Sequence, residues 1–380
     1  MMKGIINGKI ITEQGIIEHH ALIFDDKIVG IIPEKHLSQY HLSEKINAMG
    51  RFVAPGFIDI HVHGCSGFDT MDEDPEALHV ISENLLKAGV TSFLPTTMTM
   101  EFSKIDQAMG RIRQGMIHSR GAHILGCHME GPFINTANKG AQDGQYILVP
   151  EFSKIKPYLD VIKIITMAPE LTEDDGFIKA CVQAGIVVSI GHSSATYEQA
   201  RRAIEAGASH MTHTFNALPP LHHRQPGAIG AALESDAVTC EVIVDNVHVH
   251  PAMQRLLLKM KGADKIILMT DGIRACMLCD GLYDLGGQMV TVGRGEARLP
   301  DGALAGSVLL MNQAIKNFME NTGLDLLSAV KLVTVNPASE LGMLDDKGSL
   351  TLGKHADIVI FDDSIEVFDT IVGGNVLYRR

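Results

Sequence analysis

Apolar residues in the middle of the chain, from about residue 54 to 345, form short runs that alternate with stretches of helical spacing. The runs are rich in Ile, Val, Met and Thr, and such nearly unbroken runs are typical of strands buried on both faces of a parallel sheet. Helical spacing separates them, for example in 77–87 and 197–205. We count eight candidate strands, at 57–61, 91–97, 122–128, 161–168, 186–191, 209–214, 239–244 and 265–270. This rhythm predicts a (β/α)8 barrel, with its active site at the carboxyl ends of the strands.

The two ends of the chain have a different pattern, in which short β-favouring runs alternate with turn residues. In residues 3–33 the runs are interrupted at Asn7-Gly8 and at Asp25-Asp26, where we predict hairpin turns. Residues 348–378 have the same character. The economical interpretation is a small β-sandwich domain built from both chain termini, residues 1–53 plus 346–380, beside a barrel of residues 54–345.

Polar and ligand-type side chains follow the predicted barrel strands at the points where these strands end. His61 and His63 project to the same side of an extended strand, because residues two apart share a face. The later strand ends carry, in order, Thr96-Thr97, His128 with Glu130, Glu170, His192-Ser193, His213 with Asn216, Asp245 to His248, and Thr270-Asp271. One such residue can be a simple cap or turn residue, but the repeated placement favours a single shared site.

Several of these side chains together predict a metal centre. Imidazole and carboxylate ligands suit zinc, iron or a similar divalent ion and disfavour calcium or magnesium. A catalytic ion lowers the pKa of bound water to roughly 7, and a nearby carboxylate such as Asp271 can take the proton and return it to a leaving amine. We therefore expect metal-assisted hydrolysis of a carbon–nitrogen bond. The candidate ligands are His61, His63, Glu130, His192 and His213.

Composition and charge narrow the choice of partners and compartment. The chain of 380 residues has 45 acidic and 32 basic side chains, and its net charge of -13 opposes general attraction to nucleic acid or an anionic membrane. Residues 1–15 lack the pattern of a signal peptide, and no apolar run approaches the ~20 residues that span a bilayer, so we expect a cytoplasmic protein. Six scattered cysteines fit reduced thiols, since only Cys276 and Cys279 form a C-x-x-C pair.

Longer motifs around the candidate ligands resemble those of a known family. They are Ala54-Pro-Gly-Phe-Ile-Asp before His61, His128-Met-Glu-Gly-Pro-Phe, Lys139-Gly-Ala-Gln, Gly191-His-Ser, Thr212-His-Thr-Phe-Asn-Ala-Leu, His223-Arg-Gln-Pro-Gly, Asp245-Asn-Val-His, Thr270-Asp-Gly, Leu304-Ala-Gly-Ser and Gly353-Lys-His-Ala-Asp-Ile-Val. Over essentially the whole chain, this pattern is similar to the amidohydrolase superfamily, and most of all to its amino-sugar-phosphate deacetylases. The resemblance implies hydrolysis of the N-acetyl group of N-acetylglucosamine 6-phosphate, giving glucosamine 6-phosphate and acetate.

The resemblance also implies roles for individual residues. Glu130, His192 and His213 would be the principal metal ligands, His61 and His63 would allow a second ion, and Asp271 would be the general base and acid. The implied substrate contacts are Ala141, Gln142, Asn216, Ala217, Arg224, His248, Leu304, Ala305 and Gly306. Arg224 makes independent physical sense as a planar cationic fork for phosphate. The family implies a homodimer in which the pocket borrows from the partner, and Gln142 stands where many relatives carry histidine.

Two alternatives stay open at this point. Another amidohydrolase activity, such as cyclic-amide hydrolysis or deamination, would favour a different anion pocket, and cyclic-amide hydrolases commonly carry a carboxylated lysine in place of Glu130. A non-catalytic assembly protein on the same barrel would normally have lost ligands or Asp271, and all of them are present. His128 and His210 precede better-placed ligands, so we expect them to lie in the core behind the site.

Overall fold

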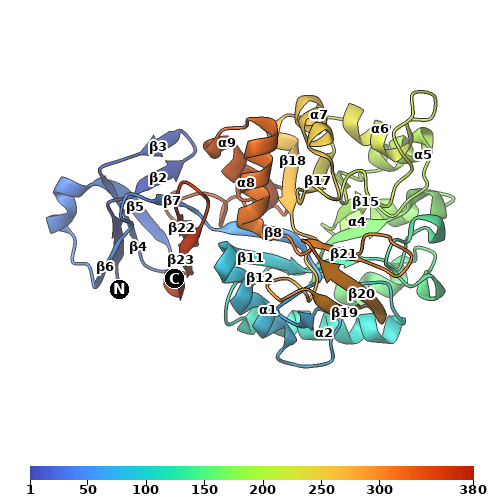
Figure 1. Cartoon of the computed structure of the whole chain (residues 1–380), viewed down its shortest axis with the longest axis horizontal. Helices are drawn as coiled ribbons and strands as arrows, with labels where there is room; N and C mark the ends of the chain where they lie inside the picture. Colours follow the sequence, from blue (N-terminus) through green and yellow to red (C-terminus); the bar gives the residue numbers. More distant parts are fainter.

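The computed structural model describes all 380 residues and contains a ring of eight parallel strands with a two-sheet unit at one end (Figure 1). Six strands form one parallel sheet in chain order, and isolated bridges join it to the other two strands, between Thr96 and His128 and between Val62 and Gly272. The predicted barrel is confirmed. Its strands are β8 (Phe57–Val62), β11 (Val90–Pro95), β13 (Cys127–Glu130), β14 (Ile162–Met167), β15 (Val187–Ile190), β16 (His210–Met211), β17 (Thr239–Ile243) and β18 (Ile266–Met269).

The third barrel strand differs from its prediction. The run 122–128 is divided into β12 (His123–Ile124), which pairs with β11, and β13, which pairs with β14. Gly126 lies at the break with a φ of +148°, a backbone conformation that side-chain-bearing residues rarely adopt. The break lets β13 continue to residue 130, so Glu130 is the last residue of the strand and lies at the carboxyl rim.

Helices cover the outside of the ring (Figure 1). The predicted helix at 197–205 is α5 (Tyr197–Glu205), which begins with a capping box in which Thr196 and Gln199 each accept from the other's backbone N–H. The prediction at 77–87 corresponds to α1 (Ala77–Leu85) followed by a 3-10 turn. The other helices are α2 (Phe102–His118), α3 (Phe152–Ile155), α4 (Gly176–Gln183), α6 (Gly227–Glu234), α7 (Pro251–Lys261), α8 (Met311–Thr322), α9 (Leu326–Lys331) and α10 (Val335–Glu340). None of the helices is long and apolar enough to span a bilayer.

Helix α10 lies at the amino-terminal end of the barrel, opposite the rim that carries the polar side chains. Asn336 donates to the backbone oxygen of Ile266, the first residue of β18, at 2.7 Å. Ala338 of the same helix packs in a buried cluster with Ile164 and Ile267, which come from β14 and β18. Apolar side chains therefore fill the lower part of the barrel and leave the carboxyl rim for chemistry.

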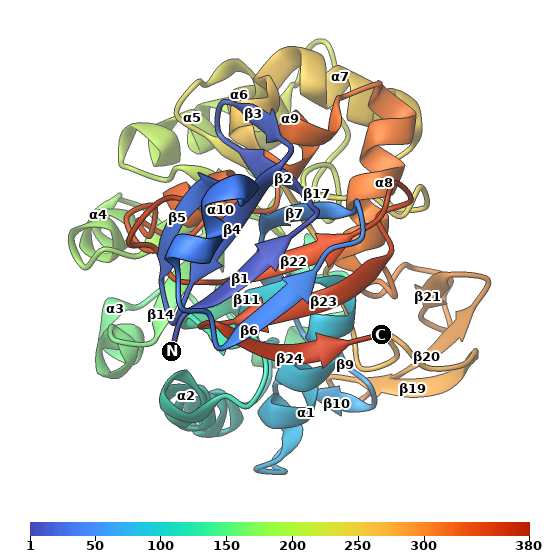
Figure 2. The same ribbon diagram turned by 90° about the vertical axis from the view of Figure 1, so that its left-hand side faces the viewer.

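The two-sheet unit takes strands from both ends of the chain, and Figure 2 views the molecule from this side. The first sheet has the order β5 (Ile28–Pro33), β4 (His20–Phe24), β1 (Lys3–Ile6) and β6 (Glu44–Asn47). The second has the order β24 (Asn375–Arg379), β23 (Val367–Val372), β22 (Ile358–Phe361), β7 (Phe52–Pro55), β2 (Lys9–Thr12) and β3 (Gly15–Ile17). Fully buried Leu22 and Phe24 of the first sheet meet Val53 and Ile358 of the second. A β-sandwich built from both termini is therefore confirmed, and β7 runs across the boundary expected at residue 53.

One of the two predicted hairpin turns is wrong. Strands β4 and β5 pair antiparallel across Asp25-Asp26, as predicted. Strands β1 and β2 flank Asn7-Gly8 but belong to different sheets, so this turn is a crossover. The physical reason is that Ile5 and Ile10 bury their side chains in the same core from opposite sheets, which a hairpin would prevent.

Two small excursions lie near the carboxyl rim. Strands β9 (Gly64–Cys65) and β10 (Phe68–Asp69) form a short hairpin directly after β8. A three-stranded sheet of β19 (Gly281–Leu285), β20 (Gln288–Gly293) and β21 (Glu296–Arg298) follows β18 and lies beside the barrel in Figure 1. Leu285 at the end of β19 reaches the cavity described below.

The contact between the two chain ends can be tested at Gly374. This glycine has a φ of +76°, and a β-carbon on it would overlap the backbone oxygen of Asp25 in the N-terminal hairpin turn. We predict that Gly374→Ala lowers the free energy of unfolding by more than the ~1–2 kcal/mol expected for left-handed strain alone. Gly353→Ala is the matched control, since Gly353 has a φ of +87° but no heavy atom within 4 Å of the added carbon. Equal losses in thermal and urea denaturation would contradict close packing here.

Candidate metal centre and active site

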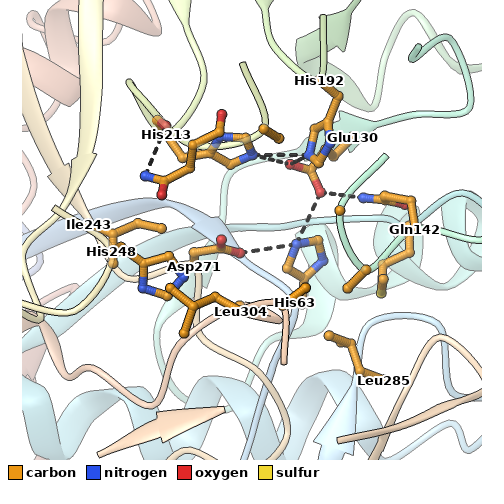
Figure 3. Close-up of a pocket in the computed structure, with 17 residues that line it drawn as sticks. His63, Glu130, Gln142, His192, His213, Ile243, His248, Asp271, Leu285 and Leu304 are labelled. Carbon is orange, nitrogen blue, oxygen red and sulfur yellow. Dashed lines mark hydrogen bonds and ion pairs between the residues drawn. The ribbon is translucent and has the colours of Figure 1, made fainter. Parts of the chain in front are cut away.

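Four histidines and two carboxylates from five different barrel strands converge at the carboxyl rim (Figure 3). All six residues are buried, with at most 7% of each exposed to solvent. They are His61 in β8, His63 just after it, Glu130 at the end of β13, and His192, His213 and Asp271, each two residues beyond the end of β15, β16 and β18. The structure thus brings together every ligand and the acid–base residue expected from the sequence.

The carboxylate of Glu130 lies at the centre of this cluster. Its Oε1 is 3.1 Å from Nε2 of both His192 and His213 and 3.4 Å from Nε2 of His61. Its Oε2 is 3.3 Å from Nε2 of His63. Glu130 is therefore shared by two groups, one with His61 and His63 and one with His192 and His213, and in each group the ligand atoms lie within 4.8 Å of one another.

An acceptor on Nδ1 orients each of the four imidazoles. Carbonyl and carboxylate oxygens only accept hydrogen bonds, so each Nδ1 donates, and in the neutral ring each Nε2 keeps its lone pair. For three of the rings the acceptor is a backbone oxygen: Thr96 for His63 at 3.2 Å, Asn138 for His192 at 2.8 Å and Asn216 for His213 at 3.2 Å. For His61 it is the side chain of Glu241, at 3.1 Å.

In the neutral rings, these lone pairs converge on one another and on Glu130. Nε2 of His192 and Nε2 of His213 are 3.0 Å apart and both face the same oxygen of Glu130. Nε2 of His61 is buried and has no hydrogen-bond partner. Converging imidazole and carboxylate lone pairs are the donor set that divalent zinc or iron prefers. The residues present therefore fit a metal ion in each of the two groups.

The charges of the site also favour a cation. Burial raises the pKa of Glu130, but the adjacent His192 and His61 outweigh it and hold this pKa well below its usual value. The pKa of Asp271 is likewise lowered, because His61 and His63 outweigh the effect of burial. For His63, burial acts to lower the pKa, but hydrogen bonds to Asp271 and Glu130 raise it to about 9. Both carboxylates are thus ionised, so they can ligate a cation once the imidazoles release their protons.

Backbone strain places three of these side chains. His192, His213 and Asp271 have φ angles of +47°, +26° and +50°, in the left-handed region that residues other than glycine rarely adopt. Each lies just beyond the end of its strand, where this backbone conformation departs from the strand direction. Such conformations persist where the surrounding structure fixes them, and they concentrate at functional sites.

A cavity of about 260 Å³ opens above the cluster and is lined by 17 residues, none of which is lysine or arginine. Seven of the nine residues expected to contact substrate line it: Ala141, Gln142, Asn216, Ala217, His248, Leu304 and Gly306. Ala305 instead packs in the main hydrophobic core, with 1% exposed. Arg224 lies on an exposed loop, where its guanidinium contacts His223 at 2.7 Å, and it does not line the cavity of its own chain.

The amide of Gln142 is engaged at both ends. Its Nε2 donates to Oε2 of Glu130 at 2.6 Å, and its Oε1 accepts from the backbone N–H of Thr99 at 2.5 Å. Figure 3 shows this side chain reaching toward the carboxylate. In this structure Gln142 therefore orients Glu130 at the edge of the cavity.

Sequence reasoning missed two buried carboxylates behind the ligands. Glu241, in the middle of β17, is 0% exposed and contacts His61 and His210. Asp59 in β8 accepts from the hydroxyl of Thr270 at 2.6 Å, and burial raises its pKa to about 7 despite this bond. The available signal was a charged residue inside an otherwise apolar strand, because buried charges are almost always paired.

A parallel barrel with imidazoles around a shared carboxylate at its carboxyl rim has the architecture of a metal-dependent hydrolase. Residues 52–377 match the Amidohydrolase family, and the chain belongs to this family. The metal dependence of that family agrees with the two ligand groups.

Three known proteins show how far this similarity extends. The chain is 41% identical to an N-acetylglucosamine-6-phosphate deacetylase of Lysinibacillus sphaericus over 93% of its own length and 91% of that protein. It is 40% identical to the enzyme of the same name from Bacillus subtilis (strain 168), over 97% and 95%. The crystal structure of an N-acetylglucosamine-6-phosphate deacetylase from Pasteurella multocida superposes with a TM-score of 0.94 at 32% identity, covering 100% of both chains.

Protons compete with the metal ion for His63, and this competition sets a pH dependence. With its pKa raised to about 9 in the metal-free chain, His63 is protonated below that pH and must release a proton when an ion binds. We predict that the affinity of the metal-free chain for zinc increases as the pH rises from about 6 to about 9. Calorimetry in buffers of different ionisation enthalpy measures both the affinity and the protons released. His63→Asn should flatten this pH profile. His118→Asn, at an exposed histidine, is the control and should leave the profile unchanged. A wild-type zinc affinity that does not change with pH would contradict the prediction.

Proposed function

We propose that this protein hydrolyses the N-acetyl group of N-acetylglucosamine 6-phosphate to glucosamine 6-phosphate and acetate. The observation that carries the proposal is the position of Asp271, whose Oδ1 lies 3.3 Å from Nε2 of His63 at the floor of the cavity. An ionised carboxylate beside two metal-ligand groups is suited to move the protons of amide hydrolysis. The names of the relatives that the chain matches over nearly its full length support the sugar phosphate as substrate.

The residues of the chain divide the work of hydrolysis. A divalent ion held by Glu130, His192 and His213 would lower the pKa of water to roughly 7. Asp271 accepts a proton from the attacking water as the water oxygen bonds to the acetyl carbon. It then donates that proton to the sugar nitrogen as the carbon–nitrogen bond breaks, so acetate and the free amine leave. The role of a general acid and base requires Asp271 to be ionised at the start, as its lowered pKa provides.

Other cavity residues position the substrate. Oδ2 of Asp245 holds Nδ1 of His248 at 2.6 Å, which fixes this ring beside Asp271 and leaves Nε2 for a ligand (Figure 3). Leu285 and Leu304 provide apolar lining, and Asn216 and Ala217 also line the cavity. A few polar groups at fixed positions are enough to orient a small ligand such as a monosaccharide in a cavity of this kind.

Two ions per chain, of zinc or iron, are the proposed cofactors. His61 and His63 are both present, and the carboxylate of Glu130 faces both ligand groups, so it would contribute to holding both ions. Cysteine chemistry supports a cytoplasmic setting for the enzyme, because all six cysteines are free thiols and five of them are buried.

The phosphate group requires a cation that the chain does not supply to its own cavity. None of the 17 lining residues is lysine or arginine, while Arg224 stands on an exposed loop, where its guanidinium has only the ring of His223 as a polar partner. We infer a two-fold homodimer in which Arg224 of each copy completes the cavity of the other. Arginine is suited to this role because its planar fork binds phosphate through two hydrogen bonds.

The activity is tested by acetate release. We expect hydrolysis of N-acetylglucosamine 6-phosphate and much slower hydrolysis of the unphosphorylated sugar. Asp271→Asn should retain metal but lose roughly 10²- to 10⁴-fold in rate, because an amide cannot carry the proton. Elemental analysis of the variant is the control for an intact metal centre. Near-full activity of the variant would remove the proton-transfer role, and ammonia release from an aminopurine or opening of a cyclic amide would favour the alternative activities.

Sharing of the site between two copies is tested by mixing variants. Arg224→Ala and Asp271→Asn should each be nearly inactive on the phosphorylated sugar when pure. If Arg224 acts on the neighbouring copy, random pairing of the two variants gives mixed dimers with one intact site, and about a quarter of wild-type activity returns. Co-expression with two affinity tags isolates the mixed dimer. If Arg224 serves its own chain, no mixed dimer has an intact site and the activity stays low.

A further inference from the structure

His61 differs from the other three imidazoles of the cluster in what holds it. Its Nδ1 donates to a carboxylate, Oε2 of Glu241, at 3.1 Å, whereas the others donate to backbone oxygens. The same oxygen of Glu241 also accepts from the backbone N–H of His213 at 3.2 Å. Glu241 therefore touches both ligand groups from behind, although it is 0% exposed and does not reach the cavity.

Glu241 is itself held from the amino-terminal end of the barrel. Its Oε1 lies 3.0 Å from Nε2 of His210, and Nδ1 of His210 lies 3.0 Å from Oε1 of Glu340 in α10. Burial acts to lower the pKa of His210, but the carboxylates of Glu340 and Glu241 raise it to about 10, so this ring is a cation. Hydrogen bonds thus join four side chains into a continuous run that crosses the barrel and ends at the ligand cluster, in the order Glu340, His210, Glu241 and His61.

This run has no metal site of its own. His61, His128 and Glu241 do bring three ligand-type atoms together, but both nitrogens of His128 are engaged. Nδ1 of His128 lies 3.0 Å from the backbone oxygen of Ile60, and Nε2 lies 2.7 Å from the hydroxyl of Thr166. The ring keeps no free lone pair for an ion, and burial lowers its pKa to about 3, so it is neutral.

A buried charge in the middle of a strand is costly, and well-packed apolar side chains could usually replace it. Its presence here is explained by what a carboxylate does to a metal-binding histidine. It fixes the tautomer that presents Nε2 to the ion, and it makes that nitrogen a stronger donor than a carbonyl partner does. Only the His61–His63 group receives this support from a side chain.

We propose that Glu241 is a positioning residue that makes the His61–His63 group able to hold its ion, and so sets whether the chain binds one ion or two. His210 and Glu340 keep the carboxylate of Glu241 aimed at His61. The inference rests on the proposed metal-dependent function, but it concerns ion binding and not the identity of the substrate.

Glu241→Gln is the decisive variant. The amide oxygen can still accept from His61 and from the backbone of His213, so the shape of the site is kept while the charge is lost. The zinc-loaded wild-type and variant proteins are titrated with a chelator, and ions per chain are counted by elemental analysis at each step. We expect the wild type to start at two ions and the variant to lose one of them at a roughly 10- to 100-fold lower chelator concentration. The ion bound by Glu130, His192 and His213 should be retained equally in both proteins.

Glu340→Gln tests the same run of side chains from its far end. It provides an independent test if Glu241→Gln does not fold. The side chain of Glu340 is 12% exposed, so the substitution is milder, and it should weaken the same single ion by a smaller factor. Thermal unfolding of the metal-free proteins checks that the fold is intact. Equal chelator curves for wild type and both variants, or loss of both ions together, would overturn the inference. A wild type that never binds more than one ion would also overturn it, while acetate release, measured separately, would leave the deacetylase assignment intact.

Discussion

The structure depends on the convergence of several lone pairs on the carboxylate of Glu130. Four imidazoles present Nε2 to this one buried side chain, and an uncompensated charge in such a place would be strongly unfavourable. A bound cation would remove this cost, because the lone pairs that otherwise repel one another would all coordinate the ion. The closed ring brings the ends of β8, β13, β15, β16 and β18 to one point, so distant parts of the chain contribute ligands to one site.

Much of this arrangement follows from the sequence, because it rests on local patterns. Apolar runs gave the strand positions within a few residues, and the residues after each run gave the ligands. The break at Gly126 and the crossover at Asn7-Gly8 were not predictable in the same way. A turn dipeptide marks a change of direction, but which strand is paired afterwards depends on burial across the sandwich. Pairings of this kind are long-range and leave no local signature.

The difference between local patterns and long-range pairings also explains why the sequence did not reveal some of the site residues. The bond between His61 and Glu241 spans 180 positions, and that between Asp59 and Thr270 spans 211. A single sequence shows that Glu241 interrupts an apolar run, but it does not show which side chain pairs with this carboxylate. Arg224 illustrates the converse, since its residue type suits a phosphate while its place in the fold keeps it outside its own cavity. Residue types indicate which reactions or ligands a side chain suits, whereas the fold decides which side chains lie close together.

The two ligand groups differ in how one imidazole, that of His61, is held, and this has a physical consequence. His192 and His213 are held by backbone oxygens, so their orientation is fixed as firmly as the loops and strand ends themselves. His61 is held by a side chain, which a single substitution can neutralise without moving the backbone. This difference supports our inference that the fold alone fixes one ion site, whereas the second depends on the charge behind His61. If Glu241 acts as we propose, the number of ions depends on this one buried carboxylate, whereas the position of the site depends on the ring of strands.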